Sequence, residues 1–542
     1  MLSLRSRAIA GVLLTAAICA CGGSASRDLN GAEPESTDAA APAAAGAGGR
    51  PVAEGGAGGV AGSPGGAGSD CIQLADPLSG TLIWARRAGG PGVDVASDVA
   101  VDPEGRLVVV GGYSEAATFG AGEPNETTVE ALGAGDGFVA RYAPDGNFET
   151  VRQMGGTSAQ SGDAVNHVAF TAGGSMLMAG KFSDVVVFGA GEPDGVELRT
   201  VAGWDAFVVS YDARGAVEWV THAGGEGADW IDAMAVTDDA VTVAAALDAD
   251  VTLGIGNADG ETPLTLQGGD RDVYVARYGL DGALQWAKSA GSPLTDTARA
   301  AAACADGTSF VAGSTYSDMV FDPGLPTELG LTSNGWLDLF LARYDRDGHL
   351  AWAKQIGGND SDEAYAIATL PDCSLLVTGY FSETAVFGAG EPNETRVTSS
   401  DLHDTFLARY SVGGQLIWFR HIAGRAIGTA LAATPDGSVF MGGWFADDVT
   451  FAPGECNQVE ISTAADDGIF VARYTDTGDL LWVREIDGTG YDSIRSIVPH
   501  PDGTVLLAGT MEQNLVLGRG EPNETTLASA GQGDAFIARF WQ

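Results

Sequence analysis

Basic residues are scarce in this sequence: lysine and arginine number 28 against 72 aspartates and glutamates, for a formal net charge of −44. A surface with this excess repels nucleic acid and bare anionic lipid headgroups, so we expect no nucleic-acid partner. Cations and basic molecules remain compatible with it. The ordinary role of such an excess is solubility, and this is the interpretation that we favour.

Histidine and cysteine are also rare, at six residues each. They form no set with zinc-ligand spacing, and the sequence has neither a phosphate-binding glycine loop nor a nucleophile elbow. An EF-hand is missing too, because GGNDSDEAY (Gly357–Tyr365) lacks the ligand spacing and the terminal glutamate. We therefore expect no catalytic residues, no metal and no cofactor, with calcium as the alternative taken up below.

Long hydrophobic runs are absent except at the N-terminus. There, Arg5 and Arg7 precede an apolar run over residues 8–20 that is too short to span a membrane as a helix. This pattern predicts a secretory signal peptide over residues 1–20. Its end, Ile18-Cys19-Ala20-Cys21, resembles the lipobox of bacterial lipoproteins. The resemblance implies that Cys21 is lipidated; the alternative is an ordinary signal peptide with a chance cysteine.

Residues 21–79 consist mostly of glycine, alanine, proline and serine. They offer too few large apolar side chains to offset the entropy of ordering, so we expect a disordered tether. A glycine-rich coil of this length has an end-to-end distance of roughly 40 Å. The tether would hold a folded domain, residues 80–542, away from a membrane.

Residues 80–542 contain seven copies of one repeat of about 66 residues. One landmark is DGFVARYAPDG (Asp136–Gly146), with counterparts such as DVYVARYGLDG and DTFLARYSVGG. The other is a tryptophan segment such as LIWARRAGG; only FETVRQMGG lacks the tryptophan, with Thr150 in its place. The segments are short, rich in β-branched and aromatic residues and separated by Asp-Gly turns. They predict strands joined by hairpins.

Four strands per repeat, here named A to D in chain order, predict an all-β fold, a seven-bladed β-propeller of four-stranded blades. Strand A should be innermost, because six of the seven repeats place alanine at one aligned position, for example Ala100, Ala235 and Ala302. The repeats open with a D strand (82–88) and close with a C strand (536–540). Joining these two closes the ring and removes both exposed sheet edges.

The repeat pattern, W…GG…D…AV…G…VVGY…F…DAFVARYD..G, resembles that of the SBBP family. Members of this family are seven-bladed propeller repeats, common in large lipoproteins of myxobacteria and related bacteria. The resemblance covers residues 80 to 542 and implies secretion and surface display. It implies no particular reaction, since propellers host both binding proteins and enzymes.

The stretch FGAGEPNET occurs at Phe119–Thr127 and again at Phe387–Thr395, and a related LGRGEPNETT begins at Leu517. It lies between strands B and C. Because strand direction alternates, the B–C and D–A connections should share one face of the ring, here the loop face. The A–B and C–D turns should share the other, here the turn face. We expect the stretch to be the longest loop of the loop face, with its aromatic residue pinning it to the blade.

An aspartate stands at the start of strand A in six of the seven repeats: Asp94, Asp163, Asp229, Asp296, Asp362 and Asp492. One interpretation is a ring of carboxylates at the channel mouth that binds calcium or a basic ligand. The other is that each carboxylate accepts backbone N–H bonds in its own loop. We favour the second, because carboxylates related by the ring should be too far apart to share an ion that needs six to eight oxygens.

A disulfide between Cys304 and Cys373 is expected, because export permits disulfides. Cys304 ends an A strand and Cys373 lies in the A–B turn of the next repeat, on the same face. The other pair, Cys71 and Cys456, would require the segment before Leu82 to reach the opposite face, so we favour it less.

Three functions remain open. We favour a lipid-anchored binding or scaffold propeller without catalytic activity, which faces the cell surface or the periplasm and binds a protein, peptide or glycan at its loop face. The second is a hydrolase or lyase that uses the central channel, where His167 on strand A is the candidate histidine. The third is a structural or adhesion protein of the envelope. In each case we expect a monomer in the bacterial cell envelope, held by its N-terminal lipid at the outer membrane.

Overall fold

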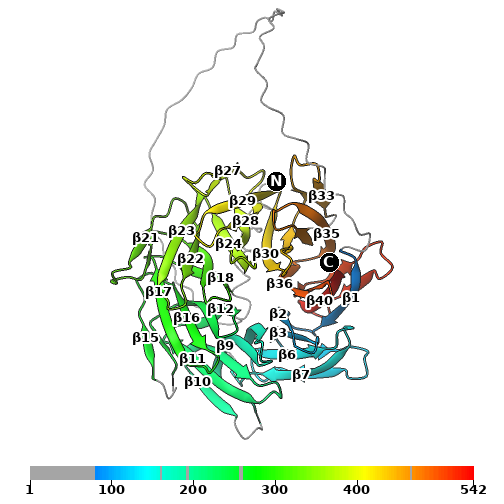
Figure 1. The fold of residues 1–542 in the computed structure, drawn as a ribbon. Helices are drawn as coiled ribbons and strands as arrows, with labels where there is room; N and C mark the ends of the chain where they lie inside the picture. The colour runs from blue at the N-terminus through cyan, green and yellow to red at the C-terminus, as the bar shows by residue number, and fades with distance from the viewer. Residues whose placement is uncertain (1–79, 159–161, 191–194, 256–259, 464–466) are drawn as a thin grey trace, which may run out of the picture. The chain divides into compact units, whose positions relative to one another are not determined.

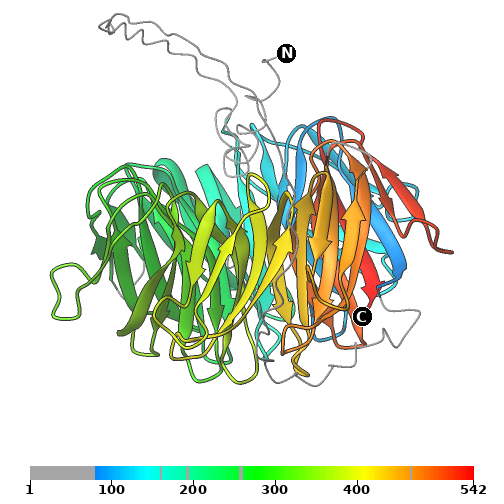
Figure 2. The same cartoon turned by 90° about the horizontal axis from the view of Figure 1, so that it is seen from above.

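The strands of residues 80–542 form seven four-stranded antiparallel sheets that follow one another around a ring (Figure 1). The computed structural model describes these residues except 159–161, 191–194, 256–259 and 464–466. Seen edge-on, the strands run between the two faces of the ring, where the connections lie (Figure 2). The described residues contain no helix. The predicted all-β, seven-bladed propeller is confirmed.

Each blade uses its strands in chain order, with A innermost. The A strands are β2 (Asp94–Val101), β8 (Ala164–Phe170), β12 (Asp229–Val236), β18 (Asp296–Ala303), β24 (Asp362–Thr369), β30 (Ala426–Ala433) and β36 (Ser493–His500). The B strands are β3 (Leu107–Tyr113), β9 (Met176–Phe188), β13 (Ala240–Leu247), β19 (Ser309–Thr315), β25 (Leu375–Phe381), β31 (Val439–Phe445) and β37 (Thr504–Met511). The C strands are β6 (Asp136–Tyr142), β10 (Val196–Tyr211), β16 (Asp272–Gly279), β22 (Asp338–Tyr344), β28 (Asp404–Tyr410), β34 (Gly468–Tyr474) and β40 (Asp534–Trp541). The D strands are β7 (Phe148–Met154), β11 (Val217–Gly225), β17 (Leu284–Gly291), β23 (Leu350–Gly358), β29 (Leu416–Ala423), β35 (Leu480–Thr489) and β1 (Leu82–Ala88).

The ring is closed by strand β1, which comes first in the chain but completes the last blade. β1 pairs antiparallel with β40, with Ala85 opposite Ala538 and Arg87 opposite Phe536. Each A strand also contacts the A strands of both neighbouring blades, including β36 with β2. The closure predicted from the sequence is confirmed, and it leaves neither end of the repeat array as a free edge.

Short hairpins between strands B and C add to the blades. They are β4 (Ala116–Phe119) with β5 (Thr127–Glu130), β14 (Val251–Leu253) with β15 (Thr262–Leu264), β20 (Met319–Phe321) with β21 (Leu329–Leu331), β26 (Thr384–Phe387) with β27 (Thr395–Thr398), β32 (Asp448–Phe451) with β33 (Val459–Ser462), and β38 (Asn514–Leu517) with β39 (Thr525–Ala528). Five of them pair with the D strand of the preceding blade, as β26 does with β23. β4 makes a single bridge next to β1, through Thr118 and Gly89. The expected loop is therefore a hairpin that extends its neighbour's sheet.

The repeated stretch FGAGEPNET is the turn of this hairpin, and it does not lie on the loop face as expected. Its turn reaches the start of the D strand of its own blade, beside the C–D turn. There the Glu391 carboxylate accepts the backbone N–H of Leu416 at 2.5 Å, and the Asn393 side chain donates to the Leu416 carbonyl at 3.1 Å. Glu123 and Glu521 make the equivalent bond to the first residue of β7 and of β1.

The remaining letters of the stretch also have contacts. Glu394 accepts the backbone N–H of Gly390 across the turn at 2.7 Å, and Thr395 donates to the Asn393 carbonyl at 3.2 Å. Phe387 packs on Phe406 of its own C strand, with ring centroids 4.8 Å apart. The aromatic residue thus pins the hairpin to its own blade, while the hairpin strands pair with the preceding one. The stretch recurs because each copy joins two blades.

On the D strands, a tryptophan lies against the next blade. A Cβ built on the glycine two residues before the D strand of that blade would lie 2.6–3.1 Å from the indole in each of six junctions. This glycine is in the C–D turn in every blade except the last. The pairs are Trp84 with Gly146, Trp219 with Gly282, Trp286 with Gly348, Trp352 with Gly414, Trp418 with Gly478 and Trp482 with Gly80. These glycines also have positive φ, from 73° to 84°. A side chain there would be strained and would collide with the ring.

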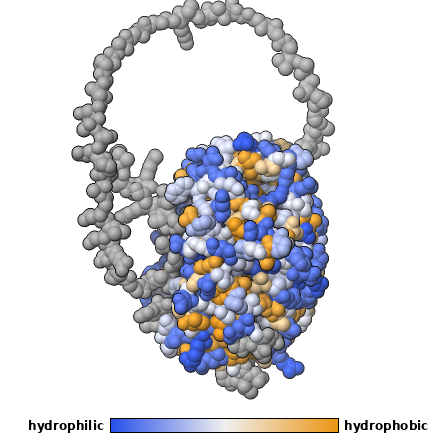
Figure 3. Space-filling view, turned by 90° about the vertical axis from the view of Figure 1, so that its left-hand side faces the viewer, coloured by the Kyte–Doolittle hydropathy of each residue, from blue (hydrophilic) through white to orange (hydrophobic). Residues whose placement is uncertain are grey.

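The outer side of the ring mixes hydrophilic areas with small, separate apolar patches over the blades shown in Figure 3. The large apolar side chains of the hub and of the blade interfaces are buried instead, as Phe138, Phe340 and Leu507 illustrate. Within the part of the chain that the structure describes, no helix is long and apolar enough to cross a membrane.

Candidate functional site

A β-bulge recurs in every A strand, three residues after the position of the repeated aspartate. In β2, for example, the register with β3 shifts between Ala96 and Asp98. A bulge turns a side chain out of the regular alternation, and bulges are frequent beside functional sites. The seven bulged residues differ chemically: Ser97, Asn166, Asp232, Arg299, Tyr365, Thr429 and Arg495. They give the hub a varied lining on an otherwise repeated frame.

Aromatic and charged side chains of blades 2 to 6 lie in a row at the strand ends next to the loop face, and the row includes three of the bulged residues, Asp232, Arg299 and Tyr365. We call this row the loop-face arc. It consists of Lys181, Trp204, Trp230, Asp232, Arg271, Arg299, Glu363, Tyr365, Tyr380, His403, Arg425 and Trp444. Most of these side chains are half-buried, whereas Glu363 and His403 are buried. They offer ring faces and polar atoms from successive blades.

The arc begins in blades 2 and 3 with two indole rings, each covered by a cation. The Lys181 ammonium lies 3.9 Å from the centre of the Trp204 ring, and the Arg271 guanidinium lies 4.5 Å from the centre of the Trp230 ring. Trp230 donates its indole N–H to Asp232 at 2.8 Å. Burial raises the pKa of Asp232 to about 6, although nearby cations oppose the shift. Cation–π contacts of this kind hold both indoles in place.

In blades 4 and 5 the arc is centred on an arginine. Arg299 donates from Nε to Glu363 at 2.9 Å, and its guanidinium lies 5.5 Å from the centre of the Tyr365 ring. Ser314 donates a second bond to Glu363, at 3.2 Å. Burial lowers the pKa of Arg299, but Glu363, Tyr365 and Asp232 together outweigh that effect and leave the pKa raised. Arg299 is therefore a permanent cation in a fixed position.

The arc ends in blades 5 and 6 as a run of ring contacts. The Tyr380 and His403 rings are 5.3 Å apart between centroids, and His403 meets Trp444 at 6.0 Å in an edge-on arrangement. Arg425 lies 5.9 Å from the centre of the Trp444 ring. Burial, helped by Arg425, lowers the pKa of His403 to about 4. His403 is therefore neutral at pH 7 and serves as part of the aromatic surface.

Exposed apolar side chains occur at the tips of the connections on the same face. Trp336 is 76% exposed, Tyr491 62% and Leu402 60%. Leu132 and Leu294 are exposed at comparable positions before strands C and A, and Val201 is exposed within β10. Large exposed apolar groups rimmed by polar residues are typical of interaction sites. Together with the arc, they give the loop face the composition of a binding surface.

The six predicted aspartates lie buried at the blade junctions, with exposed fractions of at most 4%. Asp94, Asp296 and Asp362 each accept the backbone N–H of the residue four positions earlier at 2.6 Å. Asp163 accepts from Gly156 and Ser183. Burial raises their pKa values, for example to about 7 for Asp94 and to about 8 for Asp492. Where these bonds are present, the carboxylate fixes the crossing from D to A; Asp229 has only a weak contact of this kind, with Gly225.

A second set of buried aspartates stands at the first position of the DGFVARY landmark and its counterparts, and the sequence analysis assigns it no role. The set is Asp136, Asp205, Asp272, Asp338, Asp404 and Asp534, all fully buried. Several pair with the D strand of the same blade: His222 lies 2.6 Å from Asp205, and His421 lies 2.7 Å from Asp404. Each neighbours the start of the next A strand, so that Asp534 helps to raise the pKa of Asp94. The sequence contains a signal for this set, because the aspartate at the first position of the DGFVARY landmark recurs in most repeats.

His167 lies on β8 beside Asp98 of β2, with Nδ1 3.9 Å from the nearer carboxylate oxygen. Ser496 of β36 donates directly to Asp98 at 2.6 Å. Burial lowers the pKa of His167 and raises that of Asp98. The serine hydroxyl is bonded to the acid and not to the histidine, so the imidazole is not placed to activate it as a nucleophile. The cluster joins three neighbouring A strands.

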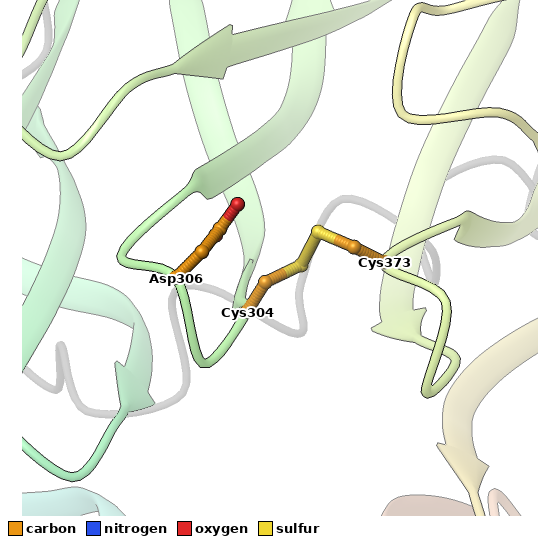
Figure 4. A group of neighbouring side chains, drawn as sticks. All are labelled: Cys304, Asp306 and Cys373. Atoms are coloured by element: carbon orange, nitrogen blue, oxygen red, sulfur yellow. A yellow bond between two sulfur atoms is a disulfide. The ribbon is translucent and has the colours of Figure 1, made fainter.

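A disulfide joins Cys304 and Cys373 across the A–B turns of blades 4 and 5, with the Cα atoms 5.8 Å apart (Figure 4). Asp306 lies beside it, but two sulfur atoms bonded to each other provide no thiolate for a metal. Cys456 is also disulfide-bonded. Cys21 and Cys71 lie outside the described residues, as do the predicted signal peptide and tether.

Comparison with known proteins supports a β-propeller repeat protein. No protein-family model matches the chain. A stretch of 296 residues, 49% of the chain, is 22% identical to an uncharacterised WD repeat-containing protein of Acanthamoeba polyphaga mimivirus, of which it covers 21%. The chain thus spans about a fifth of the length of this relative.

Solved structures also show similarity, at low sequence identity. The WD40 domain of Neurospora crassa Pan2 aligns with 86% of this chain and 96% of its own at 8% identity, with a TM-score of 0.33. Saccharomyces cerevisiae Sqt1 aligns with 86% of this chain and 100% of its own at 7% identity, with a TM-score of 0.36. The SBBP type of the repeat stays a prediction.

Proposed function

We propose that the protein is a non-catalytic binding propeller that holds a protein or peptide partner on its loop face. The observation that carries this proposal is the loop-face arc, in which tryptophan, tyrosine and arginine side chains of five blades lie at one face and are held by cation–π, ion-pair and ring contacts. These three residue types dominate binding energy at protein interfaces. They are held in place by contacts within the protein, so little side-chain freedom is lost on binding.

The exposed loop tips favour a protein or peptide over a glycan. Trp336 and Leu402 present apolar side chains at the edge of the face, where they can be covered by a partner. A glycan ligand, bound by stacking on Trp204 or Trp230 alone, is the second candidate.

The second part of the proposal concerns location. The N-terminal sequence, with its lipobox-like Cys21, supports a lipid-anchored SBBP-type protein of the bacterial cell envelope, held at the outer membrane. Changing Cys21 to Ser should move the protein from the membrane fraction to the soluble fraction, because Cys21 is the one residue at which we expect a lipid to be attached. A Cys21→Ser protein that stays with membranes would contradict this part alone.

The binding proposal is tested with peptide and glycan arrays probed with the purified chain. A variant with Trp230→Ala, Tyr380→Ala and Trp444→Ala should lose binding to the peptides that the wild type selects. A matched variant changes Val412 and Ile417, which are exposed outside the loop face, to alanine and should bind normally. Equal binding by both variants, with equal melting temperatures, would move the site elsewhere. Selection of glycans only would favour the second candidate.

A further inference from the structure

The junction between blades 1 and 2 differs from the other six. At those junctions a D-strand indole fills the space beneath the glycine two residues before the next D strand. At this junction the corresponding residues are Thr150 and Gly215, and a Cβ built on Gly215 would meet only the Arg152 guanidinium, at 3.8 Å. The hairpin here continues β9 and β10 and forms no ladder with β7 in the described residues. The junction therefore lacks both its ring and its paired hairpin.

A cavity of about 690 Å³ occupies this junction on the turn-face side. Its lining includes Thr150 and Gly215 together with Val139, Met178 and Tyr211. Met178 and Tyr211 are buried. The size lies within the range of small-molecule sites, and the lining combines apolar side chains with an unusual number of charged ones. It is separate from the loop-face arc, which lies at the opposite ends of the strands.

Arginines gather in this cavity although they are rare in the chain. Arg106, Arg141, Arg152 and Arg214 all line it. Arg106 is paired with Asp102 at 2.7 Å and with Glu104 at 2.9 Å. Arg141 has no side-chain partner among the described residues, and its Nε is buried without a hydrogen bond.

The neighbours of Arg141 explain why it stands alone. Four of the five equivalent arginines of other C strands bond to a serine or threonine two residues before the facing B-strand residue, as Arg409 does to Ser374 and Arg539 to Thr504, each at 2.8 Å. The fifth, Arg277, bonds to Gln285 and Asp239 instead. In blade 1 the position of this serine or threonine is occupied by Arg106, which offers no acceptor. An unpartnered guanidinium beside other cations favours an anion, and a carboxylate matches its planar geometry.

We propose that this junction binds an aromatic carboxylate. The ring takes the space that an indole holds at the other junctions, beneath Gly215 and against Met178 and Tyr211. The carboxylate accepts hydrogen bonds from Arg141. The missing tryptophan and the unpartnered arginine are two independent departures from the repeat, and they meet in the same cavity.

The test is isothermal titration calorimetry of the purified chain with indole-3-acetate, phenylacetate, benzoate and 2-naphthoate, with neutral indole for comparison. At least one acid should bind saturably, and about tenfold or more tightly than indole, because the charge-assisted bond is lost with the carboxylate. Thr150→Trp fills the cavity and should abolish binding. Arg141→Gln should weaken binding about tenfold or more, whereas Arg396→Gln, on an exposed hairpin strand, should leave it unchanged.

Two results would overturn the proposal. One is the absence of saturable binding by all four acids. The other is binding that is unaffected by Arg141→Gln, a change that the fold should tolerate because this side chain bonds to nothing in the described structure. The binding result for Thr150→Trp is interpreted only if this variant still shows a cooperative melt. If the variant does not fold, the result for Arg141→Gln decides the test.

Discussion

The carboxyl groups of Asp94 and Asp534 converge on Gly89, where the last blade meets the first. A Cβ built on Gly89 would lie 2.7 Å from Asp94 Oδ2 and 2.7 Å from Asp534 Cγ. Asp534 is paired with Arg87, and Asp94 accepts the backbone N–H of Gly90. Other junctions repeat this approach of two buried acids. The cost of burying two nearby negative charges is reflected in the raised pKa of the A-strand member.

The raised pKa values predict that the protein is more stable in mild acid than at neutral pH. Burial first, and nearby acids second, raise the pKa of Asp492 to about 8, and the unfolded value is close to 3.8. The folded state therefore binds more protons between these values, so the free energy of unfolding falls as the pH rises from about 4 through about 8. Thermal melts from pH 5 to pH 8 should show a falling melting temperature.

Asp492→Asn provides the control for this pH dependence. The amide keeps an oxygen that can accept the backbone N–H of Glu512 and cannot ionise. The difference between the melting temperatures at pH 5 and at pH 8 should be smaller for this variant than for the wild type. A melting temperature that rises with pH in the wild type would contradict the assignment.

Deletion of Leu82–Ala88 should abolish the cooperative melt or cause aggregation. These residues are β1, and their loss exposes the full edge of β40 and the buried side chains beneath it. Deletion of seven residues from the predicted tether, 50–56, is the matched control and should leave the melt unchanged. Scanning calorimetry of both variants against the wild type distinguishes them. An unchanged melt for the β1 deletion would refute the closure.

The acid in the FGAGEPNET turn should contribute to stability. Glu391→Ala leaves the backbone N–H of Leu416 without its charged acceptor and removes the ion pair with Lys354. We expect a loss of about 1–3 kcal/mol. Glu130→Ala, on the exposed outer strand of a hairpin, should cost less than about 0.5 kcal/mol. Urea unfolding of both variants gives the comparison, and equal losses would show that the turn contacts do not matter.

Chelation should leave the melting temperature unchanged. Asp94, Asp296 and Asp362 each have one carboxylate oxygen bonded to a backbone N–H, and Asp163 accepts two such bonds. Five junctions place one C-strand aspartate beside the A-strand aspartate, and two carboxylates supply fewer oxygens than calcium requires. Melts with EDTA and with added calcium measure this. A large rise with calcium that Asp94→Ala removes would establish the ion-binding alternative instead.

The propeller could be predicted from the sequence because its physical causes repeat. Alternating apolar residues, Asp-Gly turns and the small residue at Ala100 and its counterparts recur at a fixed period, and the two incomplete ends fit together. The pairing of each hairpin with the preceding blade could not be predicted. Strands as short as Val251–Leu253 have too few residues for a periodic pattern, and their partner lies in another repeat.

The candidate site could not be predicted from the sequence, because its residues do not repeat. Trp204, Trp230 and Tyr380 each occupy a repeat position at which the residue type varies from repeat to repeat. No sequence pattern therefore joins them before the blades are arranged around an axis. The absence of tryptophan at Thr150 was visible in the sequence. Its meaning required the C–D turn of the next blade, because only Gly215 shows what the missing ring leaves uncovered.

Because of the hairpins, the sequence repeat and the sheet of one blade do not have the same boundaries. A blade seen as one sheet contains strands of two repeats, since the outer pair comes from the repeat that follows. A duplicated repeat therefore contains the hairpin that pairs with the preceding blade. Its own D strand provides the edge with which the hairpin of the following repeat pairs. The three copies of the EPNET turn, at Glu123, Glu391 and Glu521, each bond in the same way to the first residue of the D strand of their own blade. Such a chain can gain whole repeats without needing a new kind of interface between blades. The number of repeats is limited by ring closure, because the last blade has to pair with the first.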